Sequence, residues 1–479
     1  MKKYIIATAL TLSAFCAAKA QVASPVSKHQ ITARALHQLD SLYHYLDSTG
    51  LYNGNILVGV GGKKVSAASI GYSNLRTKEL LKETSPFNLA SVSKQFTATG
   101  ILRLVQAGKI TLDQQITSIL PGFPYKDVTV RHLLNHTSGL PDYQELLDKH
   151  WDKTKIATNK DMLKVLIEQH PKSLFAPGTQ WQYSNTGYAI LASVIETVAH
   201  KRFADYMQEQ VFVPFGLKHT FVYTSRYAPR PIKDYAYSYV KNEAGVYVEP
   251  DSIPELDFVR YVDGVCGQGR VHSTTGDLLA WNNAVRDQKV LPKALWKEAT
   301  TAPDINGKST GYGFGLEVVQ NPERGRVLRH TGSWPAYITN NVLYLDKDVS
   351  LIYLTNKEQE SDVYQATFEA VKNIVFGKPF SFPAPLVQKE VAIDSTLYRY
   401  YVGTYATPEM EGFELTISTR EGNLYLDATG QSQTVITPES ETMFFIPGVP
   451  VRIEFKANSG AMATALILHQ NGDHEFKRK

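Results

Sequence analysis

Hydrophobic residues recur at two different spacings along the chain, and each spacing predicts its own kind of element. Apolar positions every three or four residues predict a helix over residues 31–47. Residues 54–74 alternate on either side of Gly61-Gly62, which predicts a β-hairpin with the two glycines at the turn. Helical spacing returns in residues 128–140, 161–170 and 361–375, and residues 176–200 predict a loop that runs into a long helix. Strand patterns return in residues 311–319, 337–346 and 349–356. Strands at both ends with helices between them predict one α/β domain that carries a helical insertion.

The pattern changes near residue 378. Residues 379–392 contain Pro379, Pro383 and Pro385, which predict an extended linker. Beyond the linker, short alternating strands are separated by turn signals such as Glu421-Gly422-Asn423 and Asn471-Gly472-Asp473. Residues 393–479 are therefore expected to form a separate all-β unit, a small barrel.

The first twenty residues predict a processing signal and no part of the fold. They combine two lysines at the start, a short apolar stretch and the small-residue end Ala18-Lys19-Ala20, which predict a secretory signal peptide over residues 1–20, cut before Gln21. The apolar stretch is too short for a comfortable membrane span. Cys16 suggests a lipid anchor instead, but Phe15 stands where a small residue is expected. We expect a periplasmic or secreted protein without a stable membrane anchor.

Composition narrows the class of protein further. Hydrophobic residues make up 43% of the chain and charged residues 20%, as in soluble globular proteins. The formal net charge is +4, and Lys2, Lys3 and Lys19 lie in the predicted signal peptide, so the remainder is close to neutral. This balance indicates no nucleic-acid partner. Only Cys266 remains after cleavage, so no intrachain disulfide is expected.

A serine and a lysine stand three positions apart at Ser91 and Lys94, where an apolar-periodic run begins. Residues three apart share one face of a helix, so Lys94 would lie over Ser91. A serine hydroxyl needs a positioned base to act as a nucleophile, and a lysine becomes a base when burial lowers its pKa. The same spacing occurs at Ser238 and Lys241, but no helical pattern follows there. Context therefore favours Ser91.

Two further motifs fit the same chemistry. Tyr183 and Asn185 are two residues apart in a predicted loop, so both side chains point the same way. A tyrosine hydroxyl passes protons, and an amide binds a substrate amide and Lys94. The tripeptide Tyr-Ser-Asn of residues 183–185 recurs at residues 72–74, at the end of the predicted hairpin, where we expect a turn.

The third motif is His330-Thr331-Gly332, with strand-like residues on both sides. Such a strand would form the wall opposite the nucleophile. The backbone N–H of Ser333 would then provide an oxyanion donor beside the N–H of Ser91.

Ser-x-x-Lys, Tyr-x-Asn and His-Thr-Gly, in this order, resemble the three signatures of the serine β-lactamase and D,D-peptidase superfamily, in the version found in class C β-lactamases and their esterase and peptidase relatives. The flanking residues 132–140 and 267–281 resemble the family as well. The resemblance implies an antiparallel sheet flanked by helices, with a helical insertion, over residues 28–378. The stretch 397–405 resembles the opening strand of a lipocalin-like domain, which implies such a domain over residues 393–479.

The resemblance also implies a role for each motif residue. Ser91 attacks a carbonyl and becomes acylated, while Lys94 and Tyr183 share the base and acid duties. The residues implied to bind substrate are Asn185, His330, Thr331, Gly332 and Ser333. The implied partner is a small-molecule or peptide substrate with an amide or ester bond, and no cofactor or metal is implied.

His330 departs from the lysine that β-lactamases generally show. A histidine is mostly neutral near pH 7 and supplies no fixed charge for a substrate carboxylate. Ala336 stands where many relatives carry glycine. We therefore expect an exported serine hydrolase of the D-amino-acid peptidase, carboxypeptidase, amidase or esterase type. The alternatives are a class C-like β-lactamase and a non-catalytic protein that binds peptides or cell-wall ligands.

Other candidate sites have simpler interpretations. His132 and His136 are four residues apart, as in some zinc sites, but no third ligand accompanies them, so capping and core packing are expected. The glycines of residues 264–269 lack the frame of a phosphate loop and predict a loop beside the substrate. Cys266 is expected to be a buried free thiol. Three aromatic residues near the motifs are candidates for the cleft: Trp181, Trp334 and Tyr337.

Overall fold

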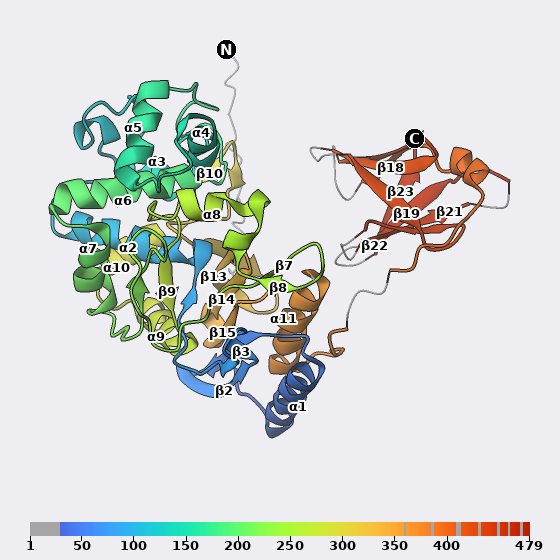
Figure 1. The fold of residues 1–479 in the computed structure, drawn as a ribbon, viewed down its shortest axis with the longest axis horizontal. Coiled ribbons are helices and arrows are strands. Elements are labelled where there is room, and N and C mark those ends of the chain that lie inside the picture. The colour runs from blue at the N-terminus through green and yellow to red at the C-terminus, as the bar shows by residue number, and fades with distance from the viewer. Residues whose placement is uncertain are drawn as a thin grey trace, which may run out of the picture.

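The structure is a computed structural model that describes residues 29–358, 361–384, 388–408, 413–429, 433–447, 451–457, 460–469 and 473–479. The predicted signal peptide and the turn at Asn471-Gly472 lie outside the described residues. Figure 1 shows an α/β domain built from the first three quarters of the chain and a barrel built from the remainder.

A six-stranded antiparallel sheet forms the centre of the α/β domain, in the order β12-β13-β14-β15-β1-β2. Its strands are β1 (Gly54–Val60), β2 (Lys63–Ile70), β12 (Glu317–Asn321), β13 (Gly325–Trp334), β14 (Tyr337–Tyr344) and β15 (Val349–Thr355). The first and last parts of the domain meet in this sheet, where Leu57 pairs with Ile352. The hairpin turn is confirmed, because Gly61 and Gly62 have φ values of 60° and 74°.

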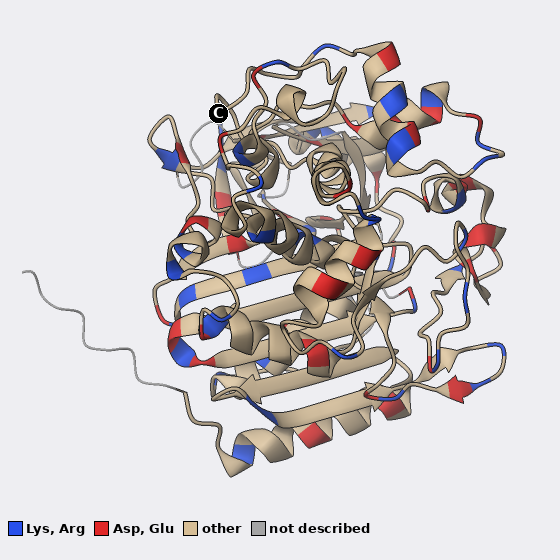
Figure 2. Ribbon diagram, turned by 90° about the vertical axis from the view of Figure 1, so that its left-hand side faces the viewer, with Lys and Arg blue, Asp and Glu red and all other residues tan. Residues whose placement is uncertain are grey.

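Both faces of the sheet are buried, since alternate residues of each strand enter different clusters. Ile56 and Tyr353 pack with α1 (Ala33–Thr49) and α11 (Ser361–Val375) on one face. Leu57 and Ile352 belong to the larger cluster on the other face. Figure 2 shows few charged residues on these strands and many on the surrounding helices and loops. Hydrophobic burial on both faces therefore fixes the sheet between two helical layers.

The helical part lies on the second face, and the described residues form nine α-helices there. They are α2 (Ser93–Gln106), α3 (Val130–Leu134), α4 (Tyr143–His150), α5 (Asn159–Gln169), α6 (Asn185–Ala199), α7 (Phe203–Met207), α8 (Phe258–Tyr261), α9 (Thr275–Arg286) and α10 (Lys293–Ala299). Helix α6 is its buried centre and contacts α2, α3, α5 and α7. Every residue of α6 from Thr186 to Ile195 is buried. Asn185 is the first residue of this rigid helix.

Short strands complete the domain, and two sequence predictions in this domain are corrected by the structure. They are β3 (Tyr72–Asn74), β4 (Glu79–Leu80), β5 (Phe87–Asn88), β6 (Phe221–Val222), β7 (Val240–Lys241), β8 (Tyr247–Val248), β9 (Val271–Ser273), β10 (Asp304–Ile305) and β11 (Lys308–Ser309). Residues 72–74 are thus a strand that pairs with β4, and the prediction of a turn there was wrong. The helix predicted over residues 128–140 ends at Leu134, because His136 takes a left-handed conformation with φ 63°.

In the part of the chain that the structure describes, the barrel is closed and has eight antiparallel strands in sequence order. They are β16 (Gly403–Ala406), β17 (Glu414–Arg420), β18 (Asn423–Ala428), β19 (Thr434–Pro438), β20 (Met443–Phe445), β21 (Arg452–Lys456), β22 (Ala465–His469) and β23 (Asp473–Arg478). Buried side chains such as Tyr405, Phe444 and Phe455 fill its interior. Residues 395–400 form a 3-10 helix, so the first strand starts later than its sequence pattern predicts.

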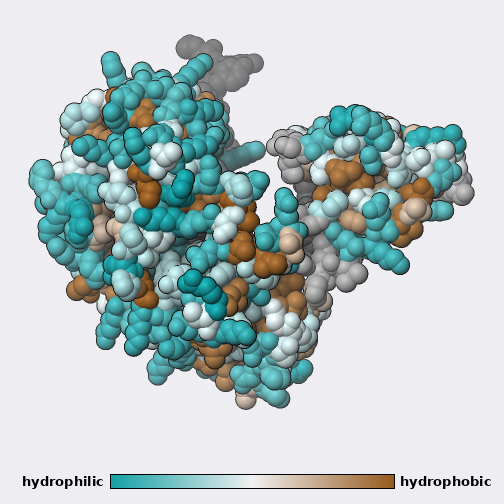
Figure 3. Space-filling view, viewed as in Figure 1, coloured by the Kyte–Doolittle hydropathy of each residue, from teal (hydrophilic) through white to brown (hydrophobic). Residues whose placement is uncertain are grey.

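The surface of the molecule is largely hydrophilic on the face in Figure 3, with small hydrophobic patches between polar side chains. Among the helices of the described residues, none has the length and apolar character needed to cross a bilayer.

Candidate active site

Ser91 lies in a short 3-10 turn, Ala90–Val92, that leads directly into α2. The turn is held from both sides, because Asn88 Oδ1 accepts a hydrogen bond from Ala90 N at 2.9 Å and Thr339 Oγ1 donates to Leu89 O at 2.8 Å. Ala90 has φ 47°, a left-handed conformation that costs free energy in a residue other than glycine. The surrounding contacts therefore impose a strained backbone that places Ser91 at the start of α2.

Lys94 lies beneath Ser91 and is fully buried. Its Nζ is 3.0 Å from Ser91 Oγ, 2.9 Å from Asn185 Oδ1 and 2.9 Å from Gln268 O. The amide oxygen and the backbone carbonyl are acceptors only, whereas the serine hydroxyl either donates or accepts. A neutral amine has two N–H donors and one lone pair, which match this set of partners when Ser91 donates its proton to Nζ.

Burial favours this neutral form. It lowers the pKa of Lys94 well below its ordinary value of 10.5, because a charged ammonium loses its hydration in the interior. Among the described residues no carboxylate makes an ion pair with Lys94 that would restore the charge. The amine is thus suited to take a proton from Ser91.

Tyr183 and Asn185 converge on the same amine from the start of α6. The Lys94 Nζ lies 4.8 Å from the centre of the Tyr183 ring. Ser184, between them, is extended and caps α6 by accepting from Gly187 N at 3.2 Å. Although 37% of Tyr183 is exposed, desolvation raises the pKa of its hydroxyl, and a hydrogen bond with Ser91 opposes this rise only in part. Tyr183 therefore stays protonated at neutral pH and can donate, while Lys94 is the better base.

His136 supports Tyr183 from behind. The centres of the two rings are 4.4 Å apart, and His136 is completely buried. Its Nδ1 accepts a hydrogen bond from Ser184 N at 3.1 Å. His132 instead caps α3 through its contact with Thr129 N. The capping and packing roles expected for the two histidines are confirmed, and the described residues contain no group of three metal-ligating side chains.

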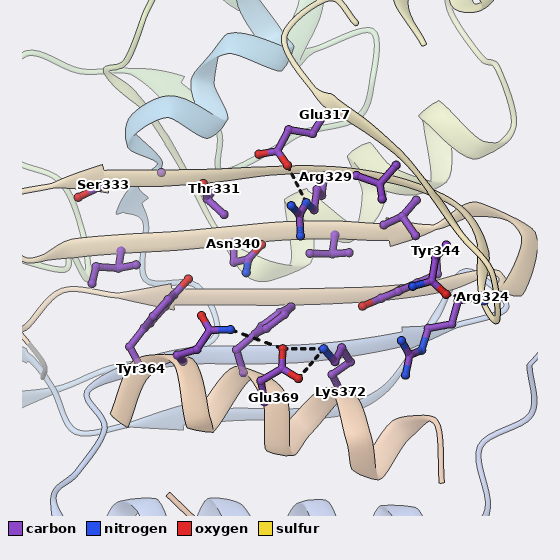
Figure 4. A pocket seen from close by; sticks show the side chains of 18 residues that line it. Glu317, Arg324, Arg329, Thr331, Ser333, Asn340, Tyr344, Tyr364, Glu369 and Lys372 are labelled. Atoms are coloured by element: carbon purple, nitrogen blue, oxygen red, sulfur yellow. Dashed lines mark hydrogen bonds and ion pairs between the residues drawn. The ribbon is translucent and has the colours of Figure 1, made fainter. Parts of the chain in front are cut away.

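The third motif lies on β13 and divides between the two faces of the sheet. His330 and Gly332 are buried toward the helical part, and an ideal Cβ on Gly332 would lie 3.0 Å from Ser91 N. Thr331 and Ser333 line a cavity of about 470 Å³ between β12–β14 and α11, on the opposite face (Figure 4). Ser333 also lines the pocket at Ser91. Close packing of β13 on the nucleophile turn thus brings this strand beside Ser91.

His330 is buried in an aromatic environment and presents no charge. Its Nε2 lies 2.9 Å from Tyr312 Oη, and its Nδ1 contacts Thr331 O. Burial lowers the pKa of His330 to about 3. The ring is therefore neutral at physiological pH and resembles a lysine only in its position.

The pocket beside Ser91 has a volume of about 60 Å³. It shares Asn88 and Trp334 with a neighbouring pocket of about 150 Å³ that includes Tyr337, so the cleft extends away from the nucleophile. Trp181 is 40% exposed and lies edge-on to His136, outside both sets of lining residues. The aromatic cleft predicted from sequence thus includes two of the three candidates.

Sequence reasoning placed residues 264–269 beside the substrate but did not single out Gln268 or Arg270. Gln268 supplies the carbonyl that binds Lys94, and both residues line the Ser91 pocket. The glycines in this segment were the sequence feature that could have pointed to Gln268 and Arg270. Gly267 has φ 105°, and its backbone approaches Tyr188 O closely, so a glycine is needed there. Cys266 is a buried free thiol, as predicted, and burial raises its pKa to about 12.

Comparisons with known proteins agree with this geometry. Residues 41–374 match the family described as Beta-lactamase, and residues 387–478 match a Domain of unknown function (DUF3471). Penicillin-binding protein 4* of Bacillus subtilis (strain 168) is 39% identical over 440 residues, which are 91% of this chain and 97% of that protein. The chain therefore belongs to the Beta-lactamase family, and it is a serine hydrolase of the kind that acts through an acyl-enzyme.

Two further similar proteins have names that refer to D-amino-acid substrates. The D-aminopeptidase of Brucella canis is 26% identical over 68% of this chain and 60% of that protein. The D-amino acid amidase of Ochrobactrum anthropi SV3, solved with L-phenylalanine amide, has a TM-score of 0.58 at 25% identity, covering 71% of this chain and 98% of that one. The likeness to the solved amidase shows the fold.

Proposed function

We propose that this chain is an exported serine hydrolase that forms an acyl-enzyme on Ser91 with D-amino-acid peptides, amides or esters. The observation that carries the proposal is the buried Lys94 amine, 3.0 Å from the Ser91 hydroxyl and held by Asn185 and Gln268. The D-aminopeptidase and D-amino acid amidase relatives support the class of substrate. The signal-peptide pattern of residues 1–20 supports a periplasmic or secreted location.

The geometry supports one order of proton transfers. Ser91 Oγ bonds to the carbonyl carbon while its proton moves to the Lys94 amine. The backbone N–H groups of Ser91 and Ser333 hold the oxyanion, and Asn185 orients the substrate. Tyr183 gives its proton to the leaving group and regains one from Lys94. Water then attacks the acyl-enzyme by the same steps in reverse, releasing the acid and restoring Ser91.

Two alternatives remain in the test. A β-lactamase is supported by the family itself, but the neutral, buried His330 gives no charge to a β-lactam carboxylate. A binding protein without turnover would have little use for a buried amine beside a serine.

We also propose that residues 28–378 form the catalytic domain and that residues 379–392 link it to a lipocalin-like barrel over residues 393–479. The filled interior of the barrel suits a role in supporting the fold.

A neutral fluorophosphonate probe tests the nucleophile. After labelling and proteolysis, mass spectrometry is expected to find the probe on Ser91 and none on Ser238, the serine of the second Ser-x-x-Lys. D-amino-acid amides, N-acyl-D-peptides, short-chain esters and a chromogenic cephalosporin then rank the substrates. Fastest turnover of the cephalosporin would favour the β-lactamase, and an unlabelled Ser91 without turnover would favour the binding protein.

The pH dependence of labelling tests Lys94 as the base. Since burial lowers its pKa, the active neutral amine forms as pH rises through a value well below 10.5. We expect the labelling rate to increase with pH and to level off well before pH 10.5. A rate that climbs only near the ordinary lysine value would contradict an uncharged amine in the resting enzyme.

A further inference from the structure

His136 lies directly behind Tyr183, although none of the three motifs includes it. It follows helix α3 and takes a left-handed conformation with φ 63°, which is uncommon for a residue with a side chain. The residue is completely buried, and burial lowers the pKa of its imidazole well below the ordinary value of 6.5. The ring is therefore neutral at physiological pH and carries a single N–H.

The hydrogen bonds of His136 fix the position of that proton. Its Nδ1 lies 3.1 Å from Ser184 N, a backbone group that can only donate, so Nδ1 is the acceptor and Nε2 carries the proton. Nε2 is buried and has no partner among the described residues. A buried N–H without an acceptor costs free energy, which an apolar side chain would avoid. This cost indicates that the histidine does more than fill space.

His136 contacts Tyr183 and the backbone on both sides of it. Gln182 N donates to His136 O at 3.0 Å, and Ser184 N donates to His136 Nδ1 at 3.1 Å. The rings of His136 and Tyr183 are in contact, with their centres 4.4 Å apart. These three contacts, here called the His136 clamp, fix the tyrosine through its backbone and its side chain together.

The loop that carries Tyr183 has little burial of its own. Every residue from 178 to 183 is exposed, and Tyr183 itself is 37% exposed. Exposed side chains contribute little hydrophobic stabilisation, so such a loop is held mainly by its hydrogen bonds. Only from Ser184, the N-cap of α6, does the chain enter a packed helix. The position of the Tyr183 hydroxyl beside the nucleophile therefore depends on the His136 clamp.

We propose that His136 is a positioning residue for protonation of the leaving group, because it holds the Tyr183 hydroxyl within reach of the scissile amide nitrogen. As the C–N bond breaks, Tyr183 passes its hydroxyl proton to the nitrogen, which leaves as an amine. The tyrosine oxygen then takes up the proton that Lys94 received from Ser91. This inference rests on the proposed function and deepens it: the clamp serves amides, whose leaving group needs a proton, more than activated esters.

Two substrates that differ only in the leaving atom test the clamp, N-acetyl-D-alanine p-nitroanilide and N-acetyl-D-alanine p-nitrophenyl ester. p-Nitrophenolate departs as a stable anion, whereas the anilide nitrogen must be protonated. In His136→Gln the side-chain amide lies at the level of Nε2, so Ser184 N loses its acceptor. We expect kcat/KM to fall at least a hundredfold for the anilide and less than tenfold for the ester. A variant that merely unfolds would lose both activities equally.

Two further variants separate positioning from packing. In His136→Asn the side-chain oxygen lies at the level of Nδ1, and asparagine tolerates a left-handed backbone, so the anilide-to-ester ratio should stay within about fivefold of the wild type. His132→Gln is the matched control, because Thr129 N then loses the same kind of bond to a histidine Nδ1, 3.3 Å long, away from Tyr183. Its ratio should equal that of the wild type. Thermal unfolding of all three variants reports their stability separately.

Amide hydrogen exchange provides a readout that needs no substrate. In His136→Gln the Ser184 N–H should exchange at least tenfold faster than in the wild type, while the buried amides of α6 stay protected. The proposal would be overturned by an unchanged ratio or an equal loss for both substrates in His136→Gln, by unchanged exchange at Ser184, or by a wild type that cleaves only the ester. Absence of Ser91 labelling in the wild type would instead overturn the proposed function, and exchange would still test the clamp.

Discussion

Lys94→Met is expected to slow acylation of Ser91 by roughly a thousandfold, the scale of a lost general base. Methionine fills the same buried space but takes no proton, so Ser91 keeps its position and loses its activation. The labelling rate with the fluorophosphonate probe measures the effect without dependence on a particular substrate.

The second Ser-x-x-Lys provides the matched control. Lys241→Met removes a lysine at the same spacing from a serine, but Lys241 is exposed and lies on the short strand β7. Its labelling rate should equal that of the wild type. A Lys94→Met protein that melts normally yet labels within tenfold of the wild-type rate would remove the amine from the mechanism. Thermal unfolding of both variants is needed, because the change at Lys94 leaves Asn185 Oδ1 and Gln268 O without their donor.

Local spacing explains why the nucleophile and its base were predictable. Ser91 and Lys94 are neighbours along one turn, so their contact depends on a few consecutive residues. The burial that makes Lys94 neutral depends instead on Asn185 and Gln268, which are 91 and 174 positions away. No sequence period reports such distant contacts. The pattern therefore predicted the pair, and the folded domain supplies its chemistry.

The faces of β13 show the same limit. Alternation along a strand predicts that His330 and Gly332 share one face and Thr331 and Ser333 the other. The packing of α2 and α11 on the sheet determines which face of β13 lies toward Ser91. Arg270 gave no signal at all, because an isolated arginine in a glycine-rich loop belongs to no repeating pattern.

The sequence predicted a small β-barrel, but it did not predict the last strand of that barrel. The last strand, β23, reads Asp-His-Glu-Phe-Lys-Arg, in which Phe476 alone is a buried apolar residue. A strand with one apolar residue is too weak a period to detect. The prediction of a helix through residue 140 was wrong because local spacing does not report distant contacts. The left-handed turn at His136 depends on contacts with the loop that carries Tyr183.

Gly332→Ala is expected to reduce acylation at least a hundredfold and to lower the free energy of unfolding by about 1–3 kcal/mol. An ideal Cβ at this position would lie 2.3 Å from Leu89 O and 2.4 Å from Thr339 Oγ1. The threonine side chain has room to rotate, whereas Leu89 O is backbone and is held by the turn that carries Ser91. The methyl group must therefore push β13 away from the nucleophile.

The separation matters because β13 is the strand that would present the Ser333 N–H to the oxyanion, and misplacement of a reacting group by about 1 Å costs near a hundredfold in rate. Gly276→Ala is the matched control: Gly276 lies in the first turn of α9, and the nearest atom to its ideal Cβ is 3.9 Å away. That variant should label and melt like the wild type. Labelling kinetics with thermal or urea unfolding measure both effects. A Gly332→Ala protein with wild-type rates would mean that contact between β13 and the nucleophile turn has no part in acylation.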